Sequence, residues 1–239
     1  RVAYPCKTEV FDLDRDGRFD ILVPGLGSFE PEDHHAGSLQ LLRQTEDGNF
    51  RRYRIAKDLG RVTDARPCDV DADGDLDIIV AVFGWLNTGE IFWLENRSQG
   101  SKRPVFVRHE IDERHGAIHI PLADLNGDGR EDFVALFSQE YESLVAFMWG
   151  PEGFTAKTLY EAPHPNWGSS SLELVDMDGD GDLDALVANG DTLDDFVLKP
   201  YHGVQWLEND GEGLWKSHPL AQMYGVHRAL ARDMDGDGD

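Results

Sequence analysis

An acidic phrase of nine residues occurs five times along the chain, and its residue types are those that bind a hard metal ion. Each copy has Asp or Asn at positions 1, 3 and 5 and Gly at position 6, and the four complete copies have Asp at position 9. The glycine permits a tight turn, so the acidic side chains and the main-chain carbonyl of position 7 can point at one centre. A shell of roughly six to eight oxygens is what Ca²⁺ requires. We therefore predict calcium loops at residues 12–20, 69–77, 124–132 and 176–184, and the start of a fifth at residues 233–239.

The predicted ligands are the residues at positions 1, 3, 5, 7 and 9 of each loop, with position 7 contributing its carbonyl oxygen. Asn126 gives the third loop a neutral oxygen in place of a carboxylate, so we expect that loop to bind calcium most weakly. The fifth copy stops before its position-9 ligand. The full set is Asp12, Asp14, Asp16, Arg18 and Asp20; Asp69, Asp71, Asp73, Asp75 and Asp77; Asp124, Asn126, Asp128, Arg130 and Asp132; Asp176, Asp178, Asp180, Asp182 and Asp184; and Asp233, Asp235 and Asp237.

The residues that follow each loop decide which kind of calcium site it forms. An EF-hand needs a bidentate Glu at position 12 and a helix after it. Position 12 is instead Val23, Val80, Ala135 or Val187. These residues lie in short apolar runs rich in β-formers, which are typical of buried strands. Each loop therefore joins two strands, and EF-hand and dockerin-like helical sites are excluded.

The spacing of the loops predicts the architecture. The first aspartates of successive copies lie 52 to 57 residues apart, and the sequence Trp-Leu-Glu-Asn occurs at residues 93–96 and again at 206–209. Each period thus holds four strands: A before the acidic loop, B after it, C around Trp-Leu-Glu-Asn, and D at the end. Four antiparallel strands repeated radially make a β-propeller. We predict an all-β fold with one propeller domain over residues 1–239, its blades at 1–59, 60–114, 115–162, 163–221 and, in part, 222–239.

The phrase Asp-x-Asp-x-Asp-Gly-x-x-Asp followed by an apolar strand, in periods of this size, resembles the FG-GAP/VCBS repeat family. Members of that family include the propeller of integrin α-subunits and many secreted bacterial proteins. The integrin-type Gly-Ala-Pro after strand B is absent here, and the Trp-Leu-Glu-Asn strands are more similar to the bacterial VCBS branch. The resemblance implies a ring of about seven blades, of which this chain would hold about four and a half as part of a longer propeller.

The net charge and the composition limit the classes of binding partner and the cellular location that can be expected. The net charge is −24, and without a basic patch the chain is not expected to bind nucleic acid. No apolar stretch reaches the roughly 18 residues needed to span a membrane. Extracellular calcium modules have dissociation constants of about 10⁻⁴–10⁻³ M, so such loops fill only where calcium is near millimolar. We therefore expect a secreted, periplasmic or cell-surface protein.

The two cysteines are not expected to bond to each other. Cys6 lies six residues before its acidic loop, and Cys68 lies one residue before its own. If neighbouring A strands keep register, this offset separates the two by about 16 Å. A disulfide needs Cα atoms within about 7 Å.

The connections opposite the calcium loops form the candidate ligand face. In an up-and-down blade, the B–C and D–A connections emerge at the end away from the A–B loops, and variable loops of this kind often carry function. Two B–C loops are long, at residues 28–37 and 189–203. His109 and His218, in contrast, are expected to be exposed on the outer D strands. The predicted ligand-binding residues are His164, Trp167, Asp191, Asp194, Tyr201, His202 and His227.

Charged residues also occur on the predicted A strands. Lys7, Asp64 and His119 each stand five residues before an acidic loop, and Glu9 and Arg66 stand three residues before one. We interpret this array as ion pairs between blades, and ligand binding near a central channel is the alternative.

These observations predict an exported, calcium-stabilised β-propeller that acts as a binding or adhesion scaffold for a glycan or protein ligand. No nucleophile elbow, His-Glu-x-x-His motif or phosphate loop occurs in the sequence. The alternative is a polysaccharide lyase or hydrolase, and a third possibility is a structural part of a larger assembly. The enzyme would use loop residues, first among them His164, His202, His227, Asp191 and Tyr201.

Overall fold

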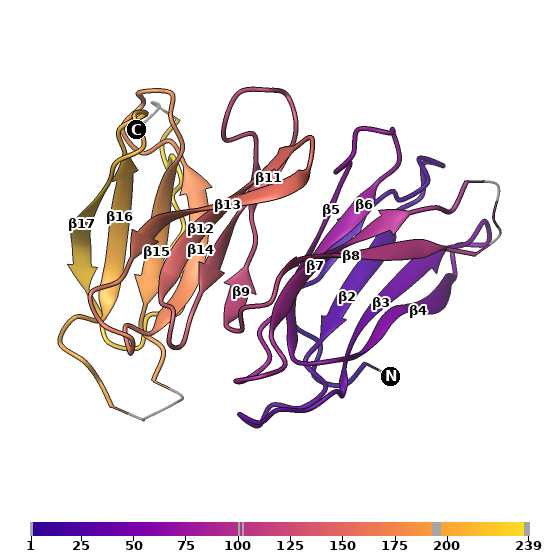
Figure 1. Ribbon diagram of the computed structural model, residues 1–239, viewed down its shortest axis with the longest axis horizontal. Helices are drawn as coiled ribbons and strands as arrows, with labels where there is room; N and C mark the ends of the chain where they lie inside the picture. Colours follow the sequence, from indigo (N-terminus) through magenta and orange to yellow (C-terminus); the bar gives the residue numbers. More distant parts are fainter. Residues whose placement is uncertain (1, 100, 102, 193–196, 237–239) are drawn as a thin grey trace. The chain divides into compact units, whose positions relative to one another are not determined.

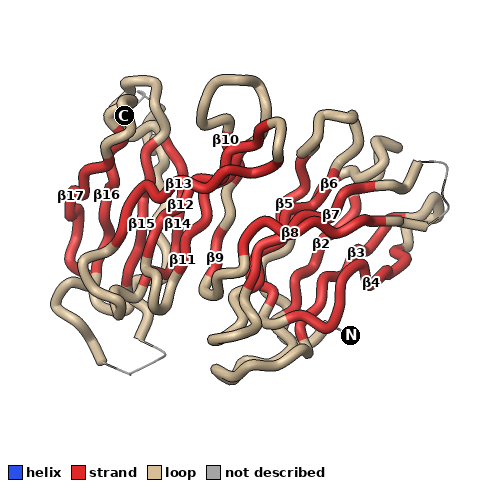
Figure 2. The backbone as a smooth tube through the Cα atoms, in the orientation of Figure 1, coloured by secondary structure: helices blue, strands red, loops and turns tan. Residues whose placement is uncertain are grey.

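Every regular element in the described part of the chain is a β-strand, and the strands pair into antiparallel sheets (Figure 1, Figure 2). The computed structural model describes residues 2–99, 101, 103–192 and 197–236. The chain divides into two compact units, Arg1–Leu122 with Gly127–Glu131, and Ala123–Asn126 with Asp132–Asp239. Among the described residues, no helix has the length and apolar character needed to cross a membrane.

The first unit contains two four-stranded sheets, and in each sheet the strands lie side by side in chain order. A short strand, β9 (Ala117–His119), follows the second sheet in the chain. The first sheet consists of β1 (Glu9–Phe11), β2 (Asp20–Gly25), β3 (Gly37–Gln44) and β4 (Phe50–Leu59), and the second of β5 (Val62–Cys68), β6 (Asp77–Val82), β7 (Glu90–Asn96) and β8 (Phe106–Asp112).

The second unit repeats this arrangement. Its last sheet has the order β14 (Ser169–Val175), β15 (Asp184–Asn189), β16 (Gly203–Asn209) and β17 (Trp215–Gln222), and its other sheet contains β11 (Asp132–Phe137), β12 (Ser143–Gly150) and β13 (Gly153–Glu161). The strand before β11 is the short β10 (Leu122–Ala123), at the division between the units. Pro121 separates β9 from β10, as expected for a residue that cannot donate a main-chain hydrogen bond to a neighbouring strand.

The prediction of four-stranded antiparallel sheets is therefore confirmed. Each acidic loop lies between the first and second strands of a repeat, and the Trp-Leu-Glu-Asn segments form the third strands, β7 and β16. Every residue of the second strands β6, β11 and β15 is buried, because an apolar run without alternation covers both faces of a sheet. The fourth strands β4, β8 and β17 consist almost entirely of exposed and half-buried residues.

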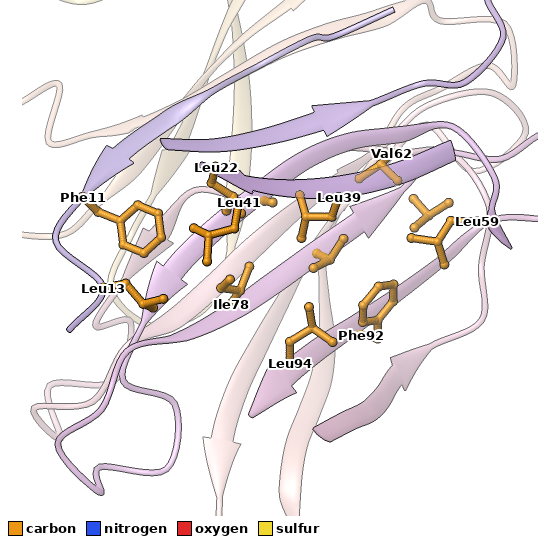
Figure 3. Packing of buried hydrophobic residues seen from close by; sticks show 13 residues of the cluster. Phe11, Leu13, Leu22, Leu39, Leu41, Leu59, Val62, Ile78, Phe92 and Leu94 are labelled. Carbon is orange, nitrogen blue, oxygen red and sulfur yellow. The ribbon is translucent and has the colours of Figure 1, made fainter. Parts of the chain in front are cut away.

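The core of the first unit joins its two sheets. Leu22 and Leu41 from the first sheet, and Ile78 and Phe92 from the second, belong to one cluster of buried side chains (Figure 3). All four are fully buried, and each such side chain stabilises the folded state by about 1.5–3 kcal/mol relative to exposure. Strands B and C of each repeat are thus fixed by packing, which positions the loops at their ends.

Both cysteines carry free thiols. The Cys6 thiol donates to the carbonyl oxygen of Val62 at 3.1 Å, and burial raises its pKa to about 11. Burial also raises the pKa of Cys68, which is 1% exposed. Since the thiolate is the reactive form, both thiols are packing groups.

Candidate metal centres and ligand groove

Three of the acidic loops gather carboxylate oxygens around one point. In each of these loops, three aspartates offer oxygen atoms that all lie within 4.8 Å of one another. The aspartates at positions 1 and 3 of the loop belong to every cluster, and the last member stands at position 5 or position 9. The clusters are Asp12, Asp14 and Asp16; Asp69, Asp71 and Asp77; and Asp176, Asp178 and Asp184.

The main chain of each loop folds around the position-1 carboxylate. The position-6 N–H of Gly17, Gly74 and Gly181 donates to the first aspartate of its loop at 2.8, 3.0 and 3.1 Å, respectively. These glycines have φ values of 84°, 96° and 97°, in the region that favours glycine. A Cβ atom there would meet nothing within 4 Å, so the turn requires glycine for its dihedral angle and not for space.

The position-9 aspartates are buried and tie each acidic loop to the third strand of its sheet. Asp77 is 1% exposed. Its Oδ1 accepts the Asn96 N–H at 2.7 Å and its Oδ2 accepts the Val70 N–H at 3.1 Å. Bonds of the same kind recur in the other repeats, to Asp20 from Gln44, to Asp132 from Trp149 and Leu125, and to Asp184 from Asn209 and Met177.

The Trp-Leu-Glu-Asn motif supports the loop from the third strand. Asn96 and Asn209 donate from Nδ2 to the carbonyl oxygens of Leu76 and Leu183, at 3.0 and 3.3 Å, one residue before the position-9 aspartate. The leucine of the motif is buried in both copies. The motif therefore recurs because it closes the acidic loop, and its asparagine contributes both main-chain and side-chain hydrogen bonds.

The tryptophan and glutamate of the motif hold a histidine on the fourth strand. Trp93 stacks on His109 with ring centroids 4.5 Å apart, and Glu95 Oε2 lies 2.9 Å from His109 Nε2. Trp206, Glu208 and His218 repeat the arrangement, with centroids 4.7 Å apart. Both histidines are half-buried and partnered, so the expectation of simply exposed side chains is wrong.

The second loop shows a buried oxygen that a cation would satisfy. Among the described residues, Oδ1 of Asp69 is buried and receives no hydrogen bond. A buried unpaired carboxylate oxygen is costly, and here it lies with oxygens of Asp71 and Asp77. A set of only carboxylate and carbonyl oxygens suits a hard cation such as Ca²⁺. The residues present therefore fit that ion.

The remaining predicted loops are described in part. In the third loop the Arg130 N–H donates to Asp128 Oδ1 at 2.9 Å, the bond that also joins positions 7 and 5 elsewhere. In the fifth copy the Gly236 N–H donates to Asp233 Oδ1 at 2.6 Å. Asp235 is exposed, and Asp237 lies outside the described residues.

The predicted ion pairs on the A strands are present in the first unit. Lys7 Nζ lies 2.8 Å from Asp64 Oδ2 and 3.1 Å from His119 Nδ1. Arg66 Nη1 donates to Glu9 at 2.5 Å, and Arg66 Nε lies 3.1 Å from Asp64. Burial lowers the pKa of Lys7. Opposite charges thus compensate one another within this cluster, and Asp64, which is fully buried, also accepts main-chain N–H groups.

Several of the predicted ligand-binding residues meet beside a cavity of about 420 Å³ in the second unit. Trp167 and Tyr201 stack with their centroids 4.6 Å apart and their planes 2° from parallel. The Tyr201 hydroxyl donates to the Asn166 carbonyl oxygen at 3.0 Å, which fixes the ring. The cavity, hereafter the Trp167 groove, is lined among others by Tyr160, Trp167, Tyr201, His202, Gln205 and Pro219.

The other predicted ligand residues are placed differently. His164 is exposed, with its ring 6.0 Å from that of Tyr201, and His227 is exposed on the segment after β17. The Asp191 N–H donates to the Gly168 carbonyl oxygen at 3.0 Å. Of the residues that the structure describes, these three do not line the Trp167 groove. Asp194 lies outside the described residues.

Glu142 is a buried acid that the sequence analysis missed. It is 3% exposed, it has a φ of 38°, and its oxygens accept the N–H groups of Gly168 and Ser169 at 3.0 Å each. Burial raises its pKa to about 7, and the nearby charge of Asp191 adds to the increase. No repeat or motif marks this residue, since it is one of several acidic residues in loops.

Replacing Glu142 with Gln is expected to flatten the pH dependence of stability. With a folded pKa near 7 and an unfolded value of about 4.3, the folded state binds the proton more tightly. The free energy of unfolding therefore falls as pH rises through this window, by up to about 4 kcal/mol from this group. Urea titrations at pH 5 and pH 8 measure the change, with Glu152→Gln, an exposed glutamate, as control. Equal pH dependence in wild type and Glu142→Gln would contradict the assignment.

Comparison with known proteins agrees with the repeat pattern. The profile of the FG-GAP-like repeat matches residues 12–80, 69–135 and 124–187. Each match begins at one acidic loop and ends in the second strand of the following repeat, so it spans a full repeat period. A search of curated proteins finds no match.

Proposed function

Because the chain belongs to the FG-GAP-like repeat family, we propose that it is a calcium-stabilised β-propeller that serves as a binding scaffold. Four sheets with the same strand order and the same loop-closing contacts support blades of one propeller domain over residues 1–239. The ring would contain about seven blades, within the usual range. The fifth acidic copy would begin a further blade.

Calcium would be held by positions 1, 3, 5 and 9 and by the position-7 carbonyl of each acidic loop. The observation that supports this assignment is the convergence of carboxylates in three loops, together with the buried Asp69 oxygen in the second, which receives no hydrogen bond from the described residues. When bound, the ion supplies positive charge that compensates the mutual repulsion of the aspartates. Calcium loops of extracellular modules, with dissociation constants of about 10⁻⁴–10⁻³ M, fill only near millimolar calcium. This requirement supports a secreted, periplasmic or cell-surface location.

The Trp167 groove is the proposed ligand site, and a glycan is the class it fits best. In the fourth sheet it lies where the β15–β16 connection and the end of β17 meet, and antiparallel order places these at the end away from the acidic loop (Figure 1). Aromatic side chains present apolar faces with polar edges, and sugar rings have matching apolar faces. The Ser217 hydroxyl donates to Gln205 Oε1 at 2.8 Å, and both side chains add polar groups that can hydrogen-bond to a sugar hydroxyl.

An enzymatic function has one observation in its favour. Glu142, with a pKa near 7, is the kind of carboxyl that acts as a general acid or base. Both of its oxygens accept main-chain N–H groups, however, which assigns it to holding the start of β14. A polysaccharide lyase or hydrolase is therefore the second candidate, and release of reducing ends or unsaturated products would support it.

A glycan array probed with the full chain in 1 mM calcium tests the binding proposal. We expect Trp167→Ala to weaken binding to any captured glycan about tenfold or more, since stacking of an aromatic ring contributes on the order of 1–2 kcal/mol. The matched control is Tyr224→Ala, which removes an aromatic ring that is 54% exposed in a neighbouring loop. A Trp167→Ala protein that melts as the wild type does and binds with full affinity would place the ligand elsewhere.

A further inference from the structure

We infer that Arg43, a residue of the third strand in the first repeat, lowers the calcium affinity of the first acidic loop and makes that loop weaker than the second. The inference rests on the calcium binding proposed above. Ligand charge alone would give these two loops equal affinities.

The four repeats can be compared at one position because their registers agree. The residue after the position-9 aspartate pairs across the sheet with Leu42, Leu94, Phe147 and Leu207 in the four repeats. The next residue along each third strand lies beside the loop. This position, hereafter the loop-side position, is occupied by Arg43, Glu95, Met148 and Glu208, respectively.

In the first repeat the loop-side position places a cation among the carboxylates. The Arg43 guanidinium forms an ion pair with Asp14, and its Nε lies 3.8 Å from Asp20 Oδ2. Arg18 forms a second ion pair with Asp16. Three of the four carboxylates in the first loop therefore already have a positive partner. The side chain of Arg43 is 19% exposed, so solvent screens its charge only in part.

In the second repeat the same position carries the opposite charge. The pairing of Ile78 with Leu94 places Glu95 across from Asp77, the position-9 aspartate of the second loop. Glu95 is 6% exposed and contacts Arg97 and His109 on the side of the fourth strand. The charge of Glu95 is compensated by Arg97, and among the described residues no cation pairs with the aspartates at positions 1, 3, 5 and 9 of the second loop. The second loop thus lacks the positive partners that the first loop has.

The two loops should therefore differ in affinity, although both contain aspartate at positions 1, 3, 5 and 9. A calcium ion entering the first loop must displace two guanidinium groups or bind beside them. One unit charge about 5 Å from a divalent cation changes its binding constant by roughly tenfold or more even at the dielectric constant of water. The first loop should stay empty at calcium concentrations that fill the second.

Site-resolved calcium titration of the full chain by NMR tests this ranking. The amide groups of Gly17 and Gly74 donate to the position-1 carboxylates of the first and second loops, so each resonance reports on one loop. In the wild type we expect the Gly74 resonance to respond at a calcium concentration about tenfold lower than the Gly17 resonance. Arg43→Gln should move the Gly17 midpoint about tenfold lower and leave the Gly74 midpoint unchanged.

Two matched variants test whether the effect on the first loop comes from the charge of Arg43. Arg43→Lys keeps the positive charge and should retain the high Gly17 midpoint, whereas Arg52→Gln, which removes an exposed arginine of β4, should shift neither resonance. Equal midpoints for Gly17 and Gly74 in the wild type, or no effect of Arg43→Gln in a protein whose strand amides are unchanged, would overturn the inference. If neither resonance responds to calcium concentrations up to about 10 mM, the calcium binding proposed above is itself contradicted.

Discussion

Removal of calcium with EDTA is expected to lower the melting temperature of this protein by about 3–15 °C. Each loop with a dissociation constant of about 10⁻⁴–10⁻³ M contributes about 0.4–1.4 kcal/mol at 1 mM calcium. If the first loop stays empty, the other three complete loops together contribute about 1–4 kcal/mol, and each kcal/mol corresponds to about 2–4 °C for a chain of this size. Differential scanning calorimetry in 1 mM calcium and in EDTA measures the shift.

The choice of ion provides the control for this experiment. Magnesium has the same charge but requires a smaller octahedral shell with short bonds, so it should restore little of the lost stability. Equal rescue by both ions would mean that the loops respond to general screening of the net charge of −24. A melting temperature that is the same in EDTA and in calcium would show that the loops are not stabilised by a cation.

The sequence predicted the strands and loops well because both follow from local chemistry that repeats. Positive-φ glycines such as Gly74 and uninterrupted apolar runs such as that of β6 determine local geometry without reference to distant residues. Each repeat also supplies an independent copy of the pattern. The order of the strands within each sheet could therefore be predicted before any contact between them was known.

Contacts between strands could not be predicted in the same way, because they depend on register. The position-9 aspartates were predicted to be metal ligands, yet the sequence alone does not show that the Asn96 N–H faces Asp77. From the sequence, Arg43 could only be assigned to a third strand, and its ion pair with Asp14 becomes evident only from the register of the strands. His109 was expected to be exposed because its partners Trp93 and Glu95 lie on a different strand.

The candidate ligand site could also be predicted only in part from the sequence. Trp167 and Tyr201 were selected for their residue types and loop positions, and the structure stacks them beside the groove. His227, chosen by the same criterion, lies away from that lining. Composition identifies the loops that can bind a ligand, but the folding of each loop decides which of its side chains meet.

The dual role of the position-9 aspartate predicts that two substitutions in one loop will have different calcium dependence. Asp77→Ala leaves the buried N–H groups of Val70 and Asn96 without their acceptors. Each unsatisfied group costs about 1–3 kcal/mol, partly offset because the carboxylate itself was unfavourably buried. We expect a loss of about 2–4 kcal/mol in the free energy of unfolding in EDTA, and about 1 kcal/mol more in 1 mM calcium, where the metal site is lost as well.

Asp71→Ala removes a carboxylate whose oxygen accepts only the Asp73 N–H within the loop. It should cost about 1 kcal/mol in 1 mM calcium, the contribution of one site. In EDTA the cost should disappear, because one of the repelling charges is gone. The control is Asp75→Ala, which removes an equal charge at position 7 but retains the carbonyl ligand, and it should stay within about 0.5 kcal/mol.

Urea unfolding of the three variants in calcium and in EDTA distinguishes the two roles of these aspartates. If Asp77 acts only as a metal ligand, its variant will lose its cost in EDTA as Asp71→Ala does. If Asp71 has a structural role beyond the metal, its cost will persist without calcium. The expected pattern, with one cost that disappears in EDTA and one that mostly persists there, follows from the position of Asp77 at the junction of the acidic loop and the third strand. That position requires an aspartate whether or not the loop is filled.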